Sequence, residues 1–489
     1  MALRSIMGET GKRFLWNVGT SFVARAAVKF LSFIVTIFII NYLGPENFGI
    51  YSIVLNFAMV WMVMMDFGWV DMMVREISRN PTDQTRYIST YLVAQFGLNI
   101  FSTAIFLCVI LFSGYDPAVQ GYMYIIALGL FLFGFSRPFH SLLIATESLD
   151  RIASLSFISS LLGSIVMLAG VFLRQPLPFF IWVFNLSIVL QGMFYFLFAR
   201  TKLKPWSFRP ALMLIKPIVI MSLPFTFLLV SNVLLKQIDL IMLSKMVSKT
   251  QCGVYASANK FVYPFLMFSE SVHWSIFPIL SREKDHRDRG FQRALTKTAK
   301  YLLAISGFIS VSICILAADI IVSLLKADYH SGIILLRILI WYLPMIFLSR
   351  LLFYALVSLN RMKFLMSAYG VCLALFIGLN LVLVPRYSAL GTALSLVGVN
   401  LLLLCALWVI PALKGFLHFW IESLPQLVGS LIVSGLSIVV VRMMAGGIPV
   451  FARVVTAGCT GALVFAAAVF MTGFISADEK RQLSAILKR

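Results

Sequence analysis

The sequence predicts an all-α membrane protein that crosses the bilayer many times. Of its 489 residues, 61% are hydrophobic and only 12% are charged, whereas soluble domains contain about 25% charged residues. The apolar residues gather in stretches of about 20, the length that an α-helix needs to cross the hydrocarbon core. Loops marked by charge, proline and glycine separate fourteen such predicted spans: 15–40, 49–74, 87–112, 119–146, 152–173, 178–199, 217–244, 252–281, 300–325, 332–358, 364–384, 389–410, 420–441 and 449–474.

The net charge of +21 is distributed unevenly between the two sets of loops. Alternate loops, counted from the N-terminus, carry 25 of the 40 Lys and Arg residues, whereas the opposite loops carry six. This asymmetry is the positive-inside pattern and predicts that both termini are cytoplasmic. The basic run 282–300 is interpreted as a solvated loop on an anionic leaflet, so nucleic acid is not expected as a partner. The first stretch is too long for a signal peptide and is interpreted as the first span.

A weak internal duplication divides the predicted spans into two sets of six. Gly49-Ile50-Tyr51 is echoed by Gly253-Val254-Tyr255 after 204 positions, and Arg151 and Pro176 are echoed by Arg361 and Pro385 after 210 and 209. An even number of helices per repeat predicts two lobes related by an axis along the membrane normal. The expected organisation is a six-helix lobe at 1–200, a cytoplasmic linker at 201–216, a second lobe at 217–411, and two additional helices with a cytoplasmic tail at 412–489.

Basic residues occur deep in several predicted spans. A cation at mid-bilayer costs at least ~2.5–3.5 kcal/mol, so it usually faces a wet cavity or a partner. Arginine's planar fork suits phosphate oxygens and lysine acts as a point charge, so a diphosphate or an acidic sugar is the favoured ligand. Structural pairing and snorkelling to an interface are the alternatives. The candidate substrate-binding residues are Arg25, Lys29, Arg137, Lys236, Lys260 and Arg350.

Acidic residues inside the spans are few and are candidates for gating or for coupling to H⁺ or Na⁺. They are Asp66, Asp71, Asp239 and Glu270. Asp66 is expected at the depth of Arg25 and Asp239 lies three positions after Lys236, so each has a candidate ion-pair partner, whereas Glu270 has no obvious one. For Asp66 and Glu270 the sequence leaves structural pairing and ion coupling equally open.

The sequence contains no pattern typical of an enzyme. Gly11-Lys12-Arg13 lacks the first glycine and the Ser or Thr of a P-loop, and the five histidines show no metal-ligand spacing. Six scattered cysteines form no CxxC motif and are interpreted as packing residues. We therefore expect no catalytic residue, metal or cofactor, although coupling to H⁺, Na⁺ or the membrane potential is compatible with the acidic residues.

Several motifs resemble those of one membrane protein family. They are Asn17-Val18-Gly19 with Arg25, Tyr42 to Tyr51, Asp66-Phe67-Gly68 with Arg75-Glu76-Ile77, Gln237-Ile238-Asp239 with Gly253 to Ala258, and Asn380 to Pro385 with Gly391-Thr392-Ala393. Over about residues 10–410 the chain resembles the Wzx-type polysaccharide flippases of the multidrug/oligosaccharidyl-lipid/polysaccharide (MOP) exporter superfamily. It departs from the common pattern at 248–252, where the family has a glycine-containing turn.

The resemblance implies a MATE-like fold of two six-helix lobes that works by alternating access in the bacterial inner membrane. It implies transport of an undecaprenyl-diphosphate-linked oligosaccharide for surface or exopolysaccharide assembly, with a polysaccharide polymerase and chain-length machinery as partners. Arg25 best matches the family's cationic cavity residues. The alternatives are a flippase for the peptidoglycan lipid precursor and a MATE-like multidrug or cation antiporter. A membrane glycosyltransferase is not favoured, because the sequence lacks the catalytic acidic residues that such an enzyme would need.

Overall fold

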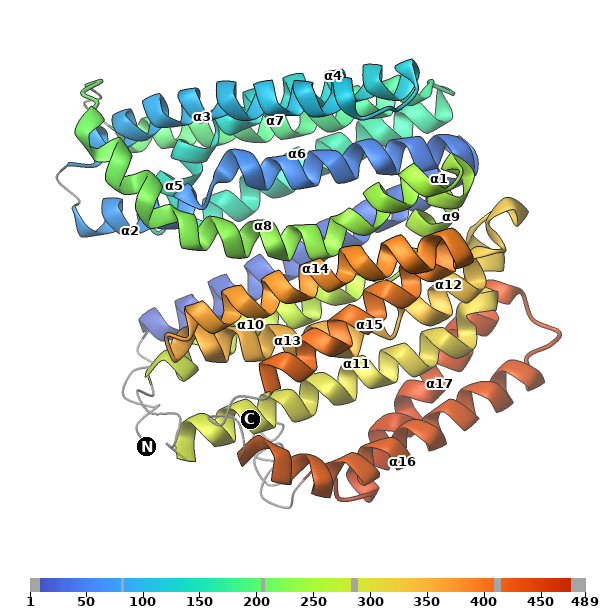
Figure 1. The fold of residues 1–489 in the computed structure, drawn as a ribbon. Coiled ribbons are helices and arrows are strands. Elements are labelled where there is room, and N and C mark those ends of the chain that lie inside the picture. Colours follow the sequence, from blue (N-terminus) through green and yellow to red (C-terminus); the bar gives the residue numbers. More distant parts are fainter. Residues whose placement is uncertain (1–8, 81–82, 204–206, 283–288, 409–414, 476–489) are drawn as a thin grey trace. The chain divides into compact units, whose positions relative to one another are not determined.

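A computed structural model describes residues 9–80, 83–203, 207–282, 289–408 and 415–475. These ranges fold into α-helices and two short 3-10 helices, with no strand among them, as expected of an all-α membrane protein (Figure 1). The helices are α1 (Glu9–Asp66), α2 (Trp69–Arg79), α3 (Gln84–Phe112), α4 (Pro117–Gly134), α5 (Arg137–Ala145), α6 (Leu149–Phe172), α7 (Leu177–Lys202), η1 (Leu212–Leu214), α8 (Ile215–Met246), α9 (Lys249–Lys260), α10 (Tyr263–Arg282), α11 (Arg289–Leu324), η2 (Ala327–Tyr329), α12 (Gly332–Leu339), α13 (Tyr342–Ser358), α14 (Met362–Tyr387), α15 (Ala389–Trp408), α16 (Gly415–Met444) and α17 (Val450–Met471).

Twelve helical segments of the described chain are long and apolar enough to cross a membrane. The segment Phe30–Asp66 counts once although it covers parts of two predicted spans, and the predicted span 252–281 is divided between α9 and α10. The chain is therefore a multi-pass membrane protein, while the number fourteen stays a prediction.

The chain forms two compact units, Met1–Gly253 and Val254–Arg489. In the first unit the long helix α1 packs against α4, α6 and α8, and α7 packs against α4 and α6. The short helices α2 and α5 pack against each other. The linker is tied to this unit because the backbone N–H groups of Arg209 and Ala211 donate hydrogen bonds to Ser89 and Thr90 on α3. The lobe boundaries expected from the sequence stay a prediction.

In the second unit α11 occupies a central position among its neighbours. It packs against α10, α12 and α13 on the one hand and against the added helices α16 and α17 on the other. The stacked rings of Phe308 and Phe465, 4.8 Å apart, join α11 to α17. Thus the two additional helices form a hairpin that is packed onto α11.

Helix α1 contains the break that the sequence predicts between the first two spans. Gly44 has φ 71° and ψ 171°, so the helix is interrupted before Pro45. Glycine suits this position because residues with a Cβ rarely adopt a positive φ. The second half of α1 ends at Asp66, earlier than the predicted 74, because Phe67 and Gly68 both have positive φ and the chain restarts as α2.

Two glycines that are equivalent in the predicted repeat meet within the first unit. A Cβ on Gly49 of α1 would lie 2.0 Å from the carbonyl oxygen of Lys249, and a Cβ on Gly253 of α9 would lie 1.8 Å from that of Pro45. Residues 45 and 249, like 49 and 253, are separated by 204 positions, so the two contacts are reciprocal. This reciprocity supports the duplication, and the backbones approach so closely only because both residues lack a side chain.

Candidate functional site

An ion pair joins two of the predicted site residues in the first unit. Arg137 Nη2 and Nε lie 2.9 Å and 3.1 Å from the same carboxylate oxygen, Oδ1 of Asp66. Only 18% of the arginine side chain and 17% of the aspartate side chain are exposed. The guanidinium also lies over the ring of Phe133, 5.4 Å from its centroid. A charge-assisted contact of this kind compensates much of the cost of keeping both charges away from water.

Both members of this pair are positioned by interruptions of their helices. Asp66 is the last residue of α1, directly before Phe67 and Gly68. Arg137 is the first residue of α5, after a break at Phe135 and Ser136, and Pro138 follows it. Proline is favoured in the first turn because its missing N–H has no intrahelical partner there. Since the N-terminus of a helix is electropositive, the nearby Asp66 carboxylate also offsets an unfavourable site for an arginine.

Buried amides support the interrupted end of α1. Gln95 of α3 donates hydrogen bonds to the carbonyl oxygen of Met65 (2.8 Å) and to Asn99 Oδ1 (2.7 Å). The hydroxyl of Thr226 on α8 donates to the carbonyl oxygen of Phe67 (2.8 Å). These donors satisfy carbonyl oxygens at the end of the helix. Burying those oxygens without a hydrogen-bond partner would be costly. They hold the backbone on both sides of Asp66.

A second ion pair joins two predicted site residues in the other unit. Arg350 Nη1 of α13 lies 3.1 Å from Glu270 Oε1 of α10, with 15% and 42% of the two side chains exposed. The expectation that Glu270 lacks an obvious partner was wrong, because residues 80 positions apart cannot be paired by helical spacing alone.

A histidine accompanies each ion pair, partly buried in the case of His140 and buried in the case of His273, and the sequence analysis missed both. His140, three positions after Arg137, stacks on Tyr195 at 5.0 Å between ring centroids. His273, three positions after Glu270, stacks on Tyr354 at 5.6 Å, and its Nδ1 is 3.1 Å from the hydroxyl of Ser269. The available signal was the i, i+3 spacing from a charged residue within a predicted span.

The remaining predicted site residues are placed differently. Lys236 of α8 is half-buried, and Asp239 is buried with its Oδ1 accepting a hydrogen bond from the backbone N–H of Leu240 (2.7 Å). Lys260 ends α9 with its ammonium 5.5 Å from the ring centroid of Tyr263. The side chains of three further candidates lie outside the described part of the structure: Arg25, Lys29 and Asp71.

A third charged cluster, which the sequence analysis also missed, holds the added hairpin. Asp319 of α11 is buried and pairs with Arg442 of α16 and, at 3.8 Å, with Arg453 of α17. Arg453 also donates hydrogen bonds to the carbonyl oxygens of Ala445, Gly446 and Ile448 in the turn between these helices. A lone aspartate in an apolar span was the signal for such a partner.

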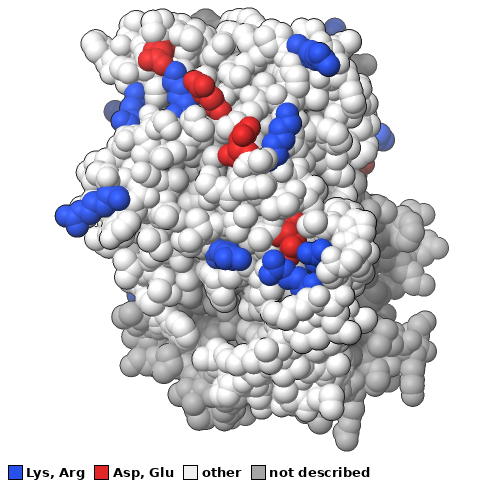
Figure 2. Space-filling model, turned by 90° about the vertical axis from the view of Figure 1, so that its right-hand side faces the viewer, with Lys and Arg blue, Asp and Glu red and all other residues white. Residues whose placement is uncertain are grey.

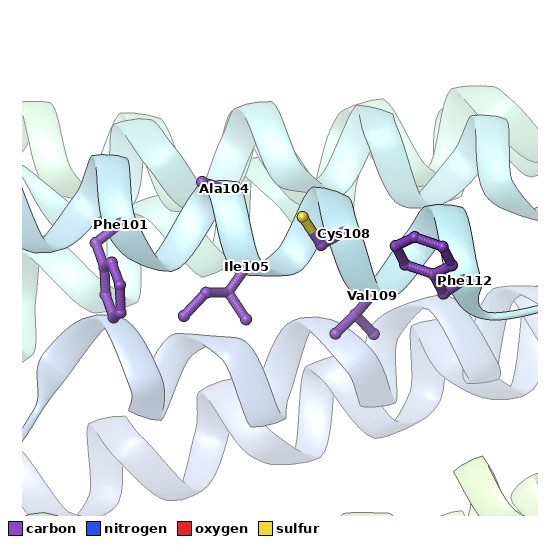
Figure 3. Close-up of a pocket in the computed structure, with 6 residues that line it drawn as sticks. All are labelled: Phe101, Ala104, Ile105, Cys108, Val109 and Phe112. Atoms are coloured by element: carbon purple, nitrogen blue, oxygen red, sulfur yellow. The ribbon is translucent and has the colours of Figure 1, made fainter.

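The exposed side of α3 illustrates the apolar surface of the first unit. Figure 3 shows a shallow pocket whose lining comes from this one helix: Phe101, Ala104, Ile105, Cys108, Val109 and Phe112. No polar group lines it, and its residues follow one helix face, as expected of a surface that contacts acyl chains. By contrast, on the face shown in Figure 2 acidic side chains lie beside basic ones in small groups surrounded by uncharged residues.

Polar contacts tie the end of α8 and the start of α9 to the loop before α4. Lys245 Nζ lies 3.0 Å from the ring centroid of Tyr115 and also donates to the carbonyl oxygen of Ser113. The Tyr115 hydroxyl hydrogen-bonds with Ser244 (2.5 Å), and Lys249 pairs with Asp116. Burial, partly offset by the Ser244 hydrogen bond, raises the pKa of Tyr115 to about 12.

This raised pKa predicts a specific loss of stability at alkaline pH. Because the folded protein holds the Tyr115 proton more tightly, the stabilisation is fully present below the ordinary pKa of 10 and is lost as the pH rises through about 12. We expect Tyr115→Phe to lower stability by about 1 kcal/mol at pH 8 and to weaken the further decline above pH 10. Thermal unfolding in detergent from pH 8 to 11 measures both effects, and parallel pH curves for the two proteins would contradict the assignment.

The comparison with protein families identifies the kind of protein that contains these sites. The model of the family described as "Polysaccharide biosynthesis protein" matches residues 14–284, more than half of the chain. The chain belongs to this family. A second family model, MatE, matches residues 224–382. The comparison with curated proteins gives no match.

Solved structures share the fold of this polysaccharide biosynthesis protein. The structure "Lipid II flippase MurJ, inward closed conformation" is similar with a TM-score of 0.76 and 13% identity, covering 93% of this chain and 98% of that one. An inward-facing multidrug resistance MATE family transporter of the MOP superfamily gives 0.62 and 15%, covering 81% and 94%. The bent form of the MATE transporter VcmN from Vibrio cholerae gives 0.51 and 11%, covering 83% and 99%.

These findings confirm the family resemblance and the fold class. The chain is a membrane protein of the MOP superfamily with a MurJ- and MATE-like fold. The proteins that share this fold are flippases and transporters and not enzymes, in agreement with the expectation from the sequence.

Proposed function

We propose that the chain is a flippase for an undecaprenyl-diphosphate-linked oligosaccharide, acting in surface or exopolysaccharide assembly. The observation that carries this proposal is the Arg137 guanidinium, held at a helix interruption within a span and still partly exposed, in a member of a polysaccharide biosynthesis family. A guanidinium fork matches two phosphate oxygens. A diphosphate head group is therefore a suitable ligand for this arginine.

The proposal includes the arrangement expected from the sequence. Lobes 1–200 and 217–411, joined by the linker 201–216, alternate the exposure of a cationic cavity between the two sides of the bacterial inner membrane. Both termini are cytoplasmic. The diphosphate is held by several of the candidate cations (Arg25, Lys29, Arg137, Lys236, Lys260 and Arg350), while the polyprenyl tail stays in lipid. A polysaccharide polymerase and chain-length machinery receive the exported unit.

The experiment asks whether Arg137 binds substrate or only balances Asp66. The double variant Asp66→Asn/Arg137→Gln removes both charges without leaving one unpaired, so it avoids the cost of an isolated buried charge. We expect at least a tenfold loss of glycan export in a deletion strain, on the order of 1.4 kcal/mol, with normal amounts of protein in the membrane. If the double variant exports glycan at the wild-type level in the deletion strain, the pair has a purely structural role and Arg137 is not part of the mechanism.

Asp116→Asn is the matched control for this experiment. It removes one carboxylate from an exposed ion pair with Lys249 in the loop before α4. Exposed pairs contribute little, so export should stay at the wild-type level. An equal loss of export in this control would show that the assay responds to any change of charge.

The MurJ-like fold favours a second candidate, the flippase for the peptidoglycan lipid precursor, because that structure matches over 93% of this chain. Depletion distinguishes the two candidates. Loss of viability with accumulated peptidoglycan precursor would support the second candidate, whereas a viable strain that lacks surface glycan supports the first. The MatE match favours a cation antiporter, for which drug sensitivity of the deletion strain is the corresponding result.

A further inference from the structure

A short segment of the first unit is fixed beside the end of a span. The candidate span Leu177–Lys202 is α7, and the chain then continues through 207–214 into α8. Leu203 before this segment and Ile218 after it are both buried in one hydrophobic cluster of the first unit. Because both ends pack against the same cluster at the end of α7, the segment 207–214 lies near the surface of the bilayer.

Hydrogen bonds to α3 hold the backbone of this segment. The N–H of Arg209 donates to the hydroxyl of Ser89 (3.3 Å), and the N–H of Ala211 donates to that of Thr90 (2.8 Å). Each hydroxyl also donates to a backbone carbonyl one turn earlier in α3, at 2.7 Å in both cases. Both hydroxyls thus act as donor and acceptor at once, and they fix the path of the segment across α3.

Three apolar side chains of the segment face away from the protein. Phe208 is 59% exposed, Leu212 is 61% exposed and Met213 is 91% exposed. Clustered apolar surface of this kind is costly in water, but it is favourable at the boundary between lipid head groups and acyl chains. The exposed side chains therefore favour contact with lipid.

Basic residues surround these apolar side chains. Residues 200–216 include five lysines and arginines, and residues 151–238 include no acidic residue. Exposed basic side chains that the structure describes there are Arg200, Lys202, Arg209 and Lys216. Arg86 of α3, in the turn before the two hydroxyls, is exposed as well. Exposed apolar and basic side chains in one segment are typical of binding to an anionic membrane surface.

We propose that the segment 207–214 is a docking site for anionic phospholipid of the adjacent leaflet. Its three exposed apolar side chains insert among the acyl chains, and the guanidinium groups of Arg209 and Arg86 bind headgroup phosphates. Arginine suits this role because its planar fork donates two hydrogen bonds to phosphate oxygens. The site is independent of which substrate the protein transports.

Lipid is a more suitable occupant of this site than a soluble protein. The segment follows the end of a span, so lipid is already present beside it and no further component has to be recruited. Each lysine or arginine near an anionic membrane surface also strengthens the association about fivefold. The charge of the segment therefore matches the lipid that is next to it.

The test is hydrogen exchange of the full-length protein in two kinds of nanodisc, one of phosphatidylcholine and one of equal parts phosphatidylcholine and phosphatidylglycerol. We expect the amides of 207–214 to exchange at least ~tenfold more slowly in the anionic nanodiscs, because headgroup binding opposes the local opening that exchange requires. High salt should reduce this lipid-dependent ratio by screening the charges. Arg209→Gln should reduce it about fivefold. Leu212→Ser/Met213→Ser should speed up exchange in both kinds of nanodisc, because insertion of apolar side chains does not need headgroup charge.

Arg174→Gln is the matched control. Arg174 is exposed in the turn before α7, at the opposite end of that helix from the segment. The change removes the same charge from the same unit, so the lipid-dependent ratio should stay at the wild-type value. Because the ratio compares one protein in two lipids, a variant that only loosens the segment exchanges faster in both and leaves the ratio unchanged.

Equal exchange of the wild-type segment in the two kinds of nanodisc would overturn the inference. An unchanged ratio in Arg209→Gln, or the same reduction in Arg174→Gln, would also overturn it, because either result shows that Arg209 does not bind the head group. Slow exchange in native membranes with fast exchange in both kinds of nanodisc would reject lipid and identify a bound protein as the occupant.

Discussion

Gly253→Ala is expected to reduce stability strongly. The new Cβ would lie 1.8 Å from the carbonyl oxygen of Pro45, and backbone atoms of a helix cannot rotate away as a side chain can. The helices would have to separate, at a cost on the order of 3 kcal/mol or more. Thermal unfolding in detergent should show a large decrease in midpoint.

Gly97→Ala on α3 is the control for this prediction. A Cβ at Gly97 would meet nothing within 4 Å, so the change should be neutral or stabilise the helix by about 0.5–1 kcal/mol. Gly49→Ala should resemble Gly253→Ala, and the two together should cost less than their sum because both disrupt the same close approach of α1 and α9. Equal midpoints for Gly253→Ala and Gly97→Ala would refute the close approach.

Asp319→Asn is expected to loosen the hairpin of α16 and α17. The change leaves Arg442 and Arg453 facing each other without a carboxylate between them. Removing one partner of a buried pair typically costs ~3–5 kcal/mol, and about 2 kcal/mol is expected here because both arginines are partly exposed. Hydrogen exchange should become faster in α16 and α17 before it does in α13.

The matched control is Asp150→Asn, at an exposed pair with Arg151 in which 61% of each side chain is accessible. Such a change is expected to stay within about 0.5 kcal/mol of wild type. If exchange in the hairpin is the same in both variants, Asp319 does not anchor it.

Much of the fold could be predicted because each membrane-spanning helix satisfies its backbone hydrogen bonds within itself. Lipid provides no hydrogen bonds, so a long apolar segment is helical whatever its neighbours are. The break at Gly44 was predicted from local chemistry, and the structure confirms it. The break after Asp66 was not, because Phe67 carries no local signal for a positive φ and is held there by Thr226, 159 positions away.

The candidate site shows the opposite balance. The sequence selected Asp66, Glu270, Arg137 and Arg350 as deep charges, but it offered Arg25 as the candidate partner of Asp66 and found no obvious partner for Glu270. The structure pairs Asp66 with Arg137 and Glu270 with Arg350, 71 and 80 positions apart. The hydropathy of a span shows that a charged residue within it is energetically costly. Which residue pairs with that charge depends instead on how the helices are rotated relative to one another.

The sequence by itself determined that this chain is a membrane protein built of long apolar helices, because that property depends on single segments and their transfer from water. Only the tertiary structure decided which arginine faces which carboxylate, where two glycines let backbones touch, and what anchors the last hairpin. Those features depend on the depth and rotation of packed helices, which packing between distant residues sets.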